Sequence, residues 1–218
     1  MSAFSLQSKV VRADAASVRL AAEALHAGGL VVFPTDTVYG IAVDPLNPEA
    51  VASIYRIKGR DAGKPLQVIL AAAAQLADVA EDVSPEARRL AERFFPGGIT
   101  LVLKKAKSVP STVVAGGETV GVRVPDHPVC HDLVRAFGRP IAATSANRSG
   151  QPSPRTAQEA MAQVGEDVTI VLDAGPCPLG IDSTVIDLST DKPRILRIGA
   201  VPVPEIERLL GVNLTALA

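Results

Sequence analysis

The stretch SVRLAAEALHAGGLVVFPTDTVYG, residues 17–40, contains a helix signal, a strand signal and a polar loop in direct succession. Apolar side chains recur at helical spacing from residue 17 onward, and the pair Gly28–Gly29 is typical of a helix end. The run LVVF, residues 30–33, is typical of a buried strand. Because helices that alternate with buried strands build α/β proteins, this stretch predicts that fold class.

The same alternation continues along the chain. NPEAVASIYRIKG (47–59) begins with Asn47 as N-cap and Pro48 at the first helical position, and LQVILA (66–71) follows as a strand. SPEARRLAERFFPGG (84–98) repeats the Ser-Pro opening and a glycine stop before the strand ITLVLKK (99–105). Further strands are predicted over 119–124, 140–144, 168–173, 183–188 and 194–198, with helices near 128–137, 155–164 and 203–210. We expect one α/β domain over 1–218, with a core of about 15–211 and a twisted, mixed open sheet with helices packed on it.

Composition excludes several classes of protein. The chain is 47% hydrophobic and 21% charged, as in ordinary globular proteins, and 22 basic residues against 23 acidic ones give a net charge of −1. That balance argues against a charge-driven nucleic-acid binder or a membrane-surface protein. The two cysteines and three histidines lack metal-ligand spacing, so no metal site is expected in the protein itself. Without a signal segment or an apolar run of about 20 residues, we expect a cytoplasmic protein with no membrane contact.

Polar segments follow several of the predicted strands, where ligands of open α/β sheets gather. They are PTDTVYG (34–40), KGRDAGKP (58–65), GVRVP (121–125), TSANRSGQPS (144–153), and GIDST (180–184) with RIG (197–199). The first is either a turn in which Asp36 and the threonines satisfy local backbone groups, or the floor of a small polar site.

The segment KGRDAGKP carries Lys58, Arg60 and Lys64 on one tight connection. It is either a solvated basic loop or a site for a polyphosphate, to which arginine offers a planar fork and lysine a point charge. No GxxxxGK[ST] motif occurs and no GxGxxG follows a strand, so a nucleotide would be bound by neither a P-loop nor a Rossmann turn.

The other segments leave similar alternatives open. Arg123 projects from the strand face opposite to that of Val122 and Val124, either as a rim arginine or as a bidentate clamp on a carboxylate. Ser153 before Pro154 resembles an N-cap, which can also lie beside a phosphate. The sequence shows no nucleophile elbow and no Cys/His pairing, which is compatible with catalysis by positioning and electrostatics.

Taken in order, PTDTVYG, KGR with KPL, PGGIT, VRVP, TSANRSG, GIDSTVID and RIG resemble the YrdC/TsaC family of threonylcarbamoyl-AMP synthases, in the short, single-domain type, over residues 15 to 211. The resemblance implies a twisted α/β sheet enclosing a basic cleft. It also implies a nucleotidyltransferase that condenses L-threonine, bicarbonate or CO2, and ATP with Mg2+ to threonylcarbamoyl-AMP and pyrophosphate for tRNA modification. The expected partners are these substrates, the proteins that transfer the threonylcarbamoyl group onward, and a weak contact with tRNA.

The resemblance also implies roles for individual residues. Lys58 and Arg60 would be catalytic. The residues that would face ATP are Lys58, Arg60, Lys64, Thr119, Ser145, Asn147, Ser153 and Arg197. Those that would face threonine are Thr37, Arg123, Ala143 through its backbone, and Ser183. Some relatives have a histidine that contacts the amino acid where this chain has Ile69, whose side chain has no hydrogen-bonding group.

Two other functions compete with this one. A similar domain occurs in a carbamoyltransferase that matures hydrogenases, but that protein adds zinc-finger regions and this chain has two cysteines. A non-catalytic RNA-binding module would use the basic loop to track a phosphate backbone. Aromatic residues make up only 3% of the chain, so few side chains could stack on bases.

Overall fold

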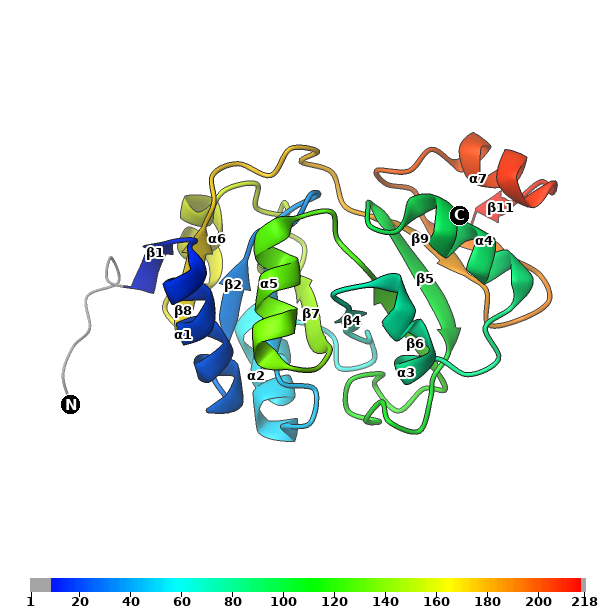
Figure 1. Ribbon diagram of the computed structural model, residues 1–218. Helices are drawn as coiled ribbons and strands as arrows, with labels where there is room; N and C mark the ends of the chain where they lie inside the picture. The colour runs from blue at the N-terminus through cyan, green and yellow to red at the C-terminus, as the bar shows by residue number, and fades with distance from the viewer. Residues whose placement is uncertain (1–8, 217–218) are drawn as a thin grey trace.

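The computed structural model describes residues 9–216, which form a sheet of eleven strands with helices on both of its faces (Figure 1). The strands are β1 (Val10–Arg12), β2 (Val31–Phe33), β3 (Gly40–Val43), β4 (Gln67–Ile69), β5 (Ile99–Lys104), β6 (Thr119–Arg123), β7 (Ile141–Ser145), β8 (Ile170–Asp173), β9 (Thr184–Asp187), β10 (Arg194–Arg197) and β11 (Thr215–Ala216). The helices are α1 (Ala15–His26), α2 (Pro48–Lys58), α3 (Leu76–Val79), α4 (Pro85–Phe94), α5 (Pro128–Phe137), α6 (Ala157–Val164) and α7 (Val203–Leu210), with a short 3-10 turn, η2 (Ala73–Gln75).

The sheet is mixed, as predicted. Its strand order is β1-β8-β2-β3-β7-β4-β6-β5-β9-β10-β11. Pairs such as β4 with β6 and β5 with β9 are parallel, whereas β3 with β7 and β5 with β6 are antiparallel. This order inserts β7 between β3 and β4, which places the segment after residue 145 beside segments that lie about a hundred residues earlier in the chain.

The core has two parts, one on each face of the sheet, because neighbouring strand residues point in opposite directions. Val31 and Phe33 of β2 pack with α1 and α5, which lie in front of the sheet in Figure 1. Val32 between them packs with the cluster that includes α2 and α6. Arg123 follows the same rule, since Val122 and Val124 belong to the second cluster and Arg123 points away from it.

Local signals placed several helix ends correctly. The Asn47 side chain accepts a hydrogen bond from the Ala50 amide at the start of α2, and Gly59 ends that helix in a left-handed conformation with φ of 57°. Ser84 caps α4 in the same way.

Other boundaries differ from the prediction. The first helix begins at Ala15, before residue 17, because the Asp14 side chain and Ser17 form a capping box. The glycine pair 97–98 does not end α4, which stops at Phe94 because Phe95 precedes a proline and is extended. Strands β1, β3 and β11 were not predicted; β3 directly follows a polar loop, and its four residues are buried on both faces.

Candidate functional site

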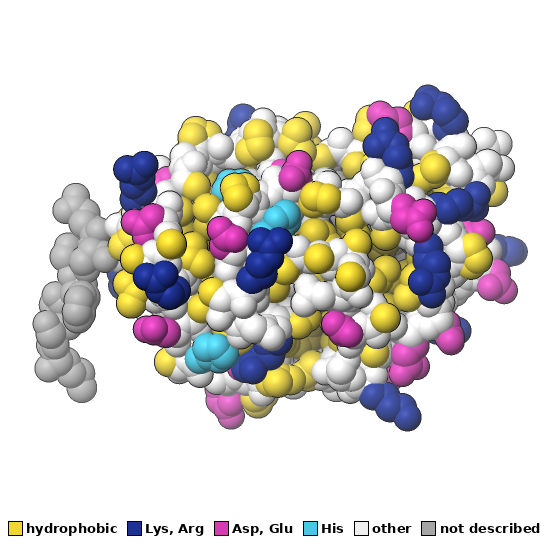
Figure 2. All heavy atoms as spheres, in the orientation of Figure 1, with side chains coloured by type: hydrophobic (Ala, Val, Ile, Leu, Met, Phe, Trp, Pro, Cys, Tyr) yellow, Lys and Arg dark blue, Asp and Glu magenta, His cyan; other side chains and the backbone are white. Residues whose placement is uncertain are grey.

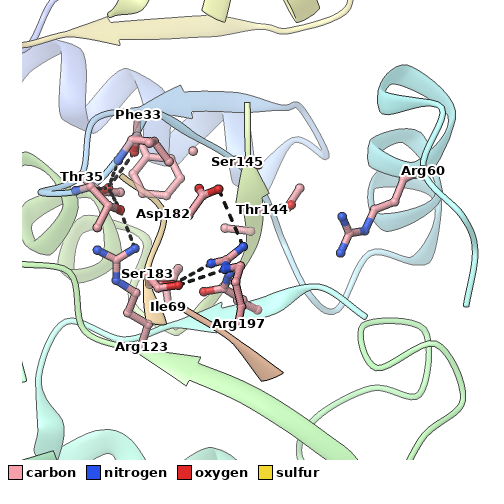
Figure 3. A pocket seen from close by; sticks show the side chains of 15 residues that line it. Phe33, Thr35, Arg60, Ile69, Arg123, Thr144, Ser145, Asp182, Ser183 and Arg197 are labelled. Carbon is pink, nitrogen blue, oxygen red and sulfur yellow. Dashed lines mark hydrogen bonds and ion pairs between the residues drawn. The ribbon is translucent and has the colours of Figure 1, made fainter. Parts of the chain in front are cut away.

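A cavity is formed by the ends of β2, β6, β7 and β10, by β4, and by the segment before β9 (Figure 3). Threonine, serine and arginine side chains supply most of its polar atoms. Its lining residues are Phe33, Thr35, Thr37, Val38, Gly40, Arg60, Gln67, Ile69, Arg123, Ala143, Thr144, Ser145, Asp182, Ser183 and Arg197.

Arg123 forms a buried polar cluster with Asp36 and Thr37. Its Nη2 donates to Asp36 Oδ1 at 2.5 Å, its Nη1 to Thr37 Oγ1 at 2.7 Å, and its Nε to the carbonyl of Gly97 at 3.0 Å. Burial lowers the pKa of Arg123, and the neighbouring Asp36 carboxylate opposes that shift. Since a guanidinium has five N–H donors, two remain beyond these contacts.

The loop PTDTVYG is a turn and a cavity wall at once. Thr35 Oγ1 accepts from the amides of Thr37 and Val38 and donates to the Val38 carbonyl, as expected of a local turn. The Thr37 hydroxyl instead faces Arg123 and lines the cavity. The segment therefore combines the two alternatives: Thr35 stabilises the turn, and both Thr35 and Thr37 line the cavity.

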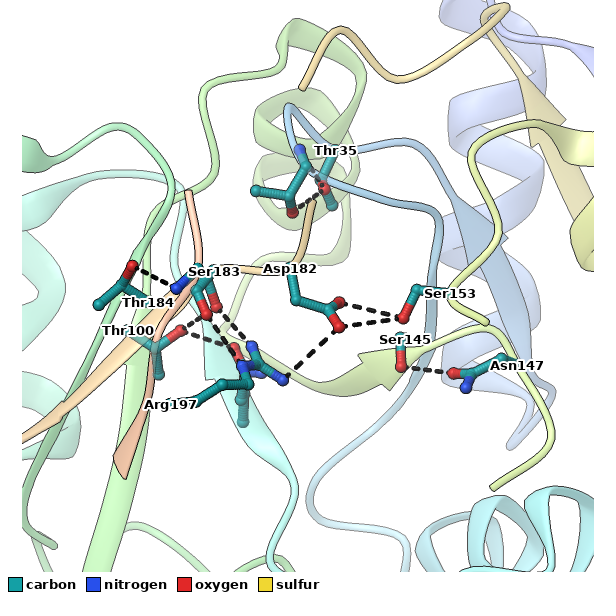
Figure 4. A network of polar contacts seen from close by, with 12 residues as sticks. Thr35, Thr100, Ser145, Asn147, Ser153, Asp182, Ser183, Thr184 and Arg197 are labelled. Atoms are coloured by element: carbon teal, nitrogen blue, oxygen red, sulfur yellow. Dashed lines mark hydrogen bonds and ion pairs between the residues drawn. The ribbon is translucent and has the colours of Figure 1, made fainter. Parts of the chain in front are cut away.

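A second polar network joins the segment before β9 to the end of β10 (Figure 4). Arg197 donates from Nε to the Ser183 carbonyl and from Nη2 to Ser183 Oγ, both at 3.0 Å. Ser183 Oγ also lies 2.8 Å from Thr100 Oγ1. Asp182 accepts from Ser153 Oγ at 3.1 Å and forms an ion pair of 3.9 Å with Arg197. Ser153 is thus not the cap of the next helix: Thr156 caps α6.

Lys58 and Arg60 occupy different environments although one residue separates them. Lys58 is buried, and its Nζ donates to the carbonyls of Ser145 and Asn147, each at 2.5 Å, and to Asn147 Oδ1 at 3.1 Å. Burial, with a smaller contribution from Arg60, lowers the pKa of Lys58 to about 7, whereas the three surrounding oxygens favour its charged form.

Arg60 leaves the end of α2 and points toward the cavity from the side opposite Arg123 (Figure 3). Its Nε donates to the Lys64 carbonyl at 3.2 Å and its Nη2 to the Pro65 carbonyl at 3.0 Å. Burial lowers the pKa of Arg60, and Arg197 across the cavity acts in the same direction.

The structure brings most of the predicted site residues together. Those that line the cavity are Thr37, Arg60, Arg123, Ala143, Ser145, Ser183 and Arg197. Three more predicted residues do not line the cavity but contact a residue that does: Lys58 and Asn147 contact Ser145, and Ser153 contacts Asp182. The exposed Lys64 meets Arg60 through its carbonyl.

Thr119 lies apart from the cavity. It shares a face of β6 with Arg123 but sits four residues earlier, about 13 Å along the strand. Ile69 does line the cavity and presents an apolar side chain there.

Besides Ile69, seven lining residues were not among the predicted site residues: Phe33, Thr35, Val38, Gly40, Gln67, Thr144 and Asp182. Asp182 lies within GIDST and Thr35 within PTDTVYG, so the polar-segment signal could have found both. Phe33 and Gln67 belong to strands and not to polar segments. They lie at the site because β2 pairs with β3 and β4 pairs with β6, which the sequence alone does not reveal.

Two features are absent from residues 9–216, a metal-binding cluster of side chains and a membrane-spanning helix. No group of three histidine, cysteine, aspartate or glutamate side chains is arranged to hold a metal ion in this part of the chain. None of the helices described is both long and apolar enough to cross a membrane.

The chain is similar in sequence and in structure to known proteins. The family model Sua5/YciO/YrdC, described as "Telomere recombination", matches residues 23–199. The threonylcarbamoyl-AMP synthases of Pyrococcus abyssi and Bacillus subtilis are 42% and 41% identical over 89% and 88% of this chain. The crystal structure of P. abyssi Sua5 complexed with L-threonine superposes with a TM-score of 0.90 at 40% identity, covering 94% of this chain and 61% of that one. The chain spans 57% and 56% of the lengths of the two relatives.

Proposed function

Because the chain belongs to the Sua5/YciO/YrdC family, we propose that it is a threonylcarbamoyl-AMP synthase, a nucleotidyltransferase that converts L-threonine, bicarbonate or CO2, and ATP into threonylcarbamoyl-AMP and pyrophosphate. The product would serve the modification of tRNA through proteins that transfer the threonylcarbamoyl group, with at most weak contact between this chain and tRNA. That role would place the protein in the cytoplasm.

The observation that carries the proposal is the convergence of three arginines on one cavity whose remaining polar atoms are mainly neutral. Arg123 with Thr37 forms one side, and Arg60 with Ser145 the other. An amino-acid carboxylate fits the two remaining N–H donors of Arg123, with the Ala143 backbone and Ser183 beside it. The triphosphate would then lie toward Arg60, Lys64, Ser145 and Arg197, with Ser153 and Asn147 in support.

This arrangement suits a reaction that needs no strong protein base. A carbamate formed from an amine and CO2 is already an anionic oxygen nucleophile, so its attack on the α-phosphorus of ATP requires mainly alignment and charge stabilisation. The arginines hold two anions together against their mutual repulsion and stabilise charge on the phosphoryl oxygens. The missing catalytic triad is consistent with this chemistry.

The Mg2+ expected with ATP fits the donor set present. Mg2+ in nucleotide sites is held by phosphate oxygens, water and one or two carboxylates. Asp182 provides a carboxylate among the lining residues, whereas the Asp36 carboxylate is taken up by Arg123. When bound, Mg2+ would neutralise charge on the phosphates.

The proposal is tested by measuring pyrophosphate release while each substrate is omitted in turn. We expect release only when L-threonine, bicarbonate, ATP and Mg2+ are all present. Detection of threonylcarbamoyl-AMP by mass spectrometry would identify the product. Equal pyrophosphate release without threonine would refute the proposal, and salt-sensitive tRNA binding without any ATP turnover would favour the RNA-binding alternative.

A further inference from the structure

We infer that Lys58 is a positioning residue, which ties the end of α2 to the segment after β7 and so holds Ser145 and Arg60 at the cavity without itself contacting the triphosphate. The inference rests on the proposed function and changes one role expected from the sequence, the direct contact of Lys58 with ATP. Its basis is the set of contacts made by Nζ.

All three N–H donors of the Lys58 ammonium group are used in hydrogen bonds within the protein. It carries three N–H donors, and three protein oxygens surround it, namely two backbone carbonyls and Asn147 Oδ1. The residue is 3% exposed and is not among those that line the cavity. To reach a phosphate it would have to give up all three contacts, and the two backbone carbonyls would lose this donor.

The contacts extend from Lys58 into a cross-link between two segments. The Ser149 amide donates to the Lys58 carbonyl at 2.7 Å, so both ends of the residue bind the segment after β7. Within that segment Ser145 Oγ donates to Asn147 Oδ1 at 2.5 Å, and Asn147 Nδ2 donates to the Gln151 carbonyl at 2.6 Å. Figure 4 shows the pair Ser145 and Asn147 at the edge of the wider polar network.

The turn after α2 explains why the two cations of KGR diverge. Gly59 has the left-handed conformation, with φ of 57°, which ends the helix and redirects the chain. Lys58 is the last helical residue and faces inward, whereas Arg60 begins the loop and reaches the cavity. Fixing the helix end through Lys58 therefore fixes the starting point of Arg60.

The first test compares Lys58→Met with Arg56→Met. Arg56 lies on the same helix, is exposed, and donates to Ser53 Oγ. For Lys58→Met we expect the KM for ATP to rise at least about tenfold while the KM for threonine stays within about twofold, and amide exchange over residues 145–151 to accelerate. Arg56→Met should change neither KM value nor the amide exchange over residues 145–151. Unchanged exchange over 145–151 in a folded Lys58→Met protein would overturn the inference.

Double-mutant cycles then separate positioning from direct contact. If Lys58 acts through the segment after β7, the effects of Lys58→Met and Asn147→Ala on the KM for ATP overlap, so that the double variant is much less impaired than the sum predicts. The effect of Lys58→Met should likewise overlap with that of Arg60→Gln, because Lys58 fixes the start of the segment that carries Arg60. Additivity of Lys58→Met with both Asn147→Ala and Arg60→Gln would show that Lys58 acts on the phosphates independently of this cross-link.

Amine acetylation of the wild-type protein, followed by mass spectrometry, provides a test that does not depend on a folded variant. We expect Lys58 to react at least about tenfold more slowly than the exposed Lys64, and ATP to slow Lys64 alone. Rapid acetylation of Lys58 that ATP suppresses would contradict the inference.

If the wild-type protein released no pyrophosphate, the proposed function would fail. Amide exchange over residues 145–151 and acetylation without ATP would still decide whether Lys58 forms the cross-link.

Discussion

Arg123 is a buried guanidinium whose shape, and not only its charge, holds the site together. It reaches Asp36, Thr37 and the Gly97 carbonyl at the same time. Arg123→Lys keeps the charge but loses the planar fork, so we expect the KM for threonine to rise at least about tenfold and the KM for ATP to change less than about twofold. Urea unfolding should show a loss of about 1–3 kcal/mol, because buried acceptors lose their donors.

A matched control is Arg135→Lys on α5, since that exposed side chain makes a single contact, with Asp132. It should leave both KM values and the free energy of unfolding unchanged. A rise in the KM for ATP alone, caused by Arg123→Lys, would place Arg123 on the nucleotide side of the cavity.

The two cysteines provide a second prediction about individual side chains. Cys130 and Cys177 are buried, and burial raises the pKa of both thiols, that of Cys177 to about 11. Because the thiolate is the reactive form, both should resist iodoacetamide in the native protein at about pH 8 and react once the chain is unfolded. Alkylation of either cysteine in the native state would show that its surroundings open.

The contact between β10 and the segment before β9 depends on a glycine. A Cβ on Gly199 would lie 2.3 Å from the Asp182 carbonyl oxygen and 2.5 Å from the Ser183 carbonyl carbon, so Gly199→Ala must push these two segments apart. Asp182, Ser183 and Arg197 all line the cavity. We therefore expect kcat/KM for ATP and threonine to fall more than about tenfold, a loss that steady-state kinetics would detect.

Gly138→Ala at the end of α5 is the control for this prediction. Gly138 has a φ of 81°, but an added Cβ meets no described atom within 4 Å, so the substitution strains the backbone without a collision. It should cost about 1–2 kcal/mol of stability and leave activity unchanged. If Gly199→Ala behaved in the same way, the close approach of β10 would not be needed by the site.

Charge is distributed unevenly over the whole molecule. The net charge is −1, and basic and acidic side chains are interspersed on the face drawn in Figure 2, yet Arg60, Arg123 and Arg197 converge on one cavity. Raising NaCl from about 0.05 to about 0.5 M should therefore raise the KM for the polyanion ATP by roughly threefold or more, through screening. The KM for threonine, a zwitterion without net charge, should change less. A similar rise for both substrates would argue against electrostatic attraction as the cause.

Much of the secondary structure could be predicted because its signals are local. The helices at 128–137 and 203–210 have the predicted bounds, and Asn47 and Ser84 act as N-caps. Local signals failed where two of them competed. A proline overrode the glycine pair at the end of α4, and four buried residues after a polar loop, β3, showed no alternation to mark a strand.

The sequence alone determined the fold class, the polar segments and, through their order, the family. Only the tertiary structure decided which polar side chains face the cavity, because that depends on partners far away in the chain. Lys58 is occupied by oxygens of residues 145 and 147, whereas Arg60 two positions later is directed to the cavity. Arg123 reaches the cavity while Thr119, on the same face of the same strand, does not. A residue type and its spacing specify what a side chain can bind; the strand order and the competition for buried donors decide what it does bind.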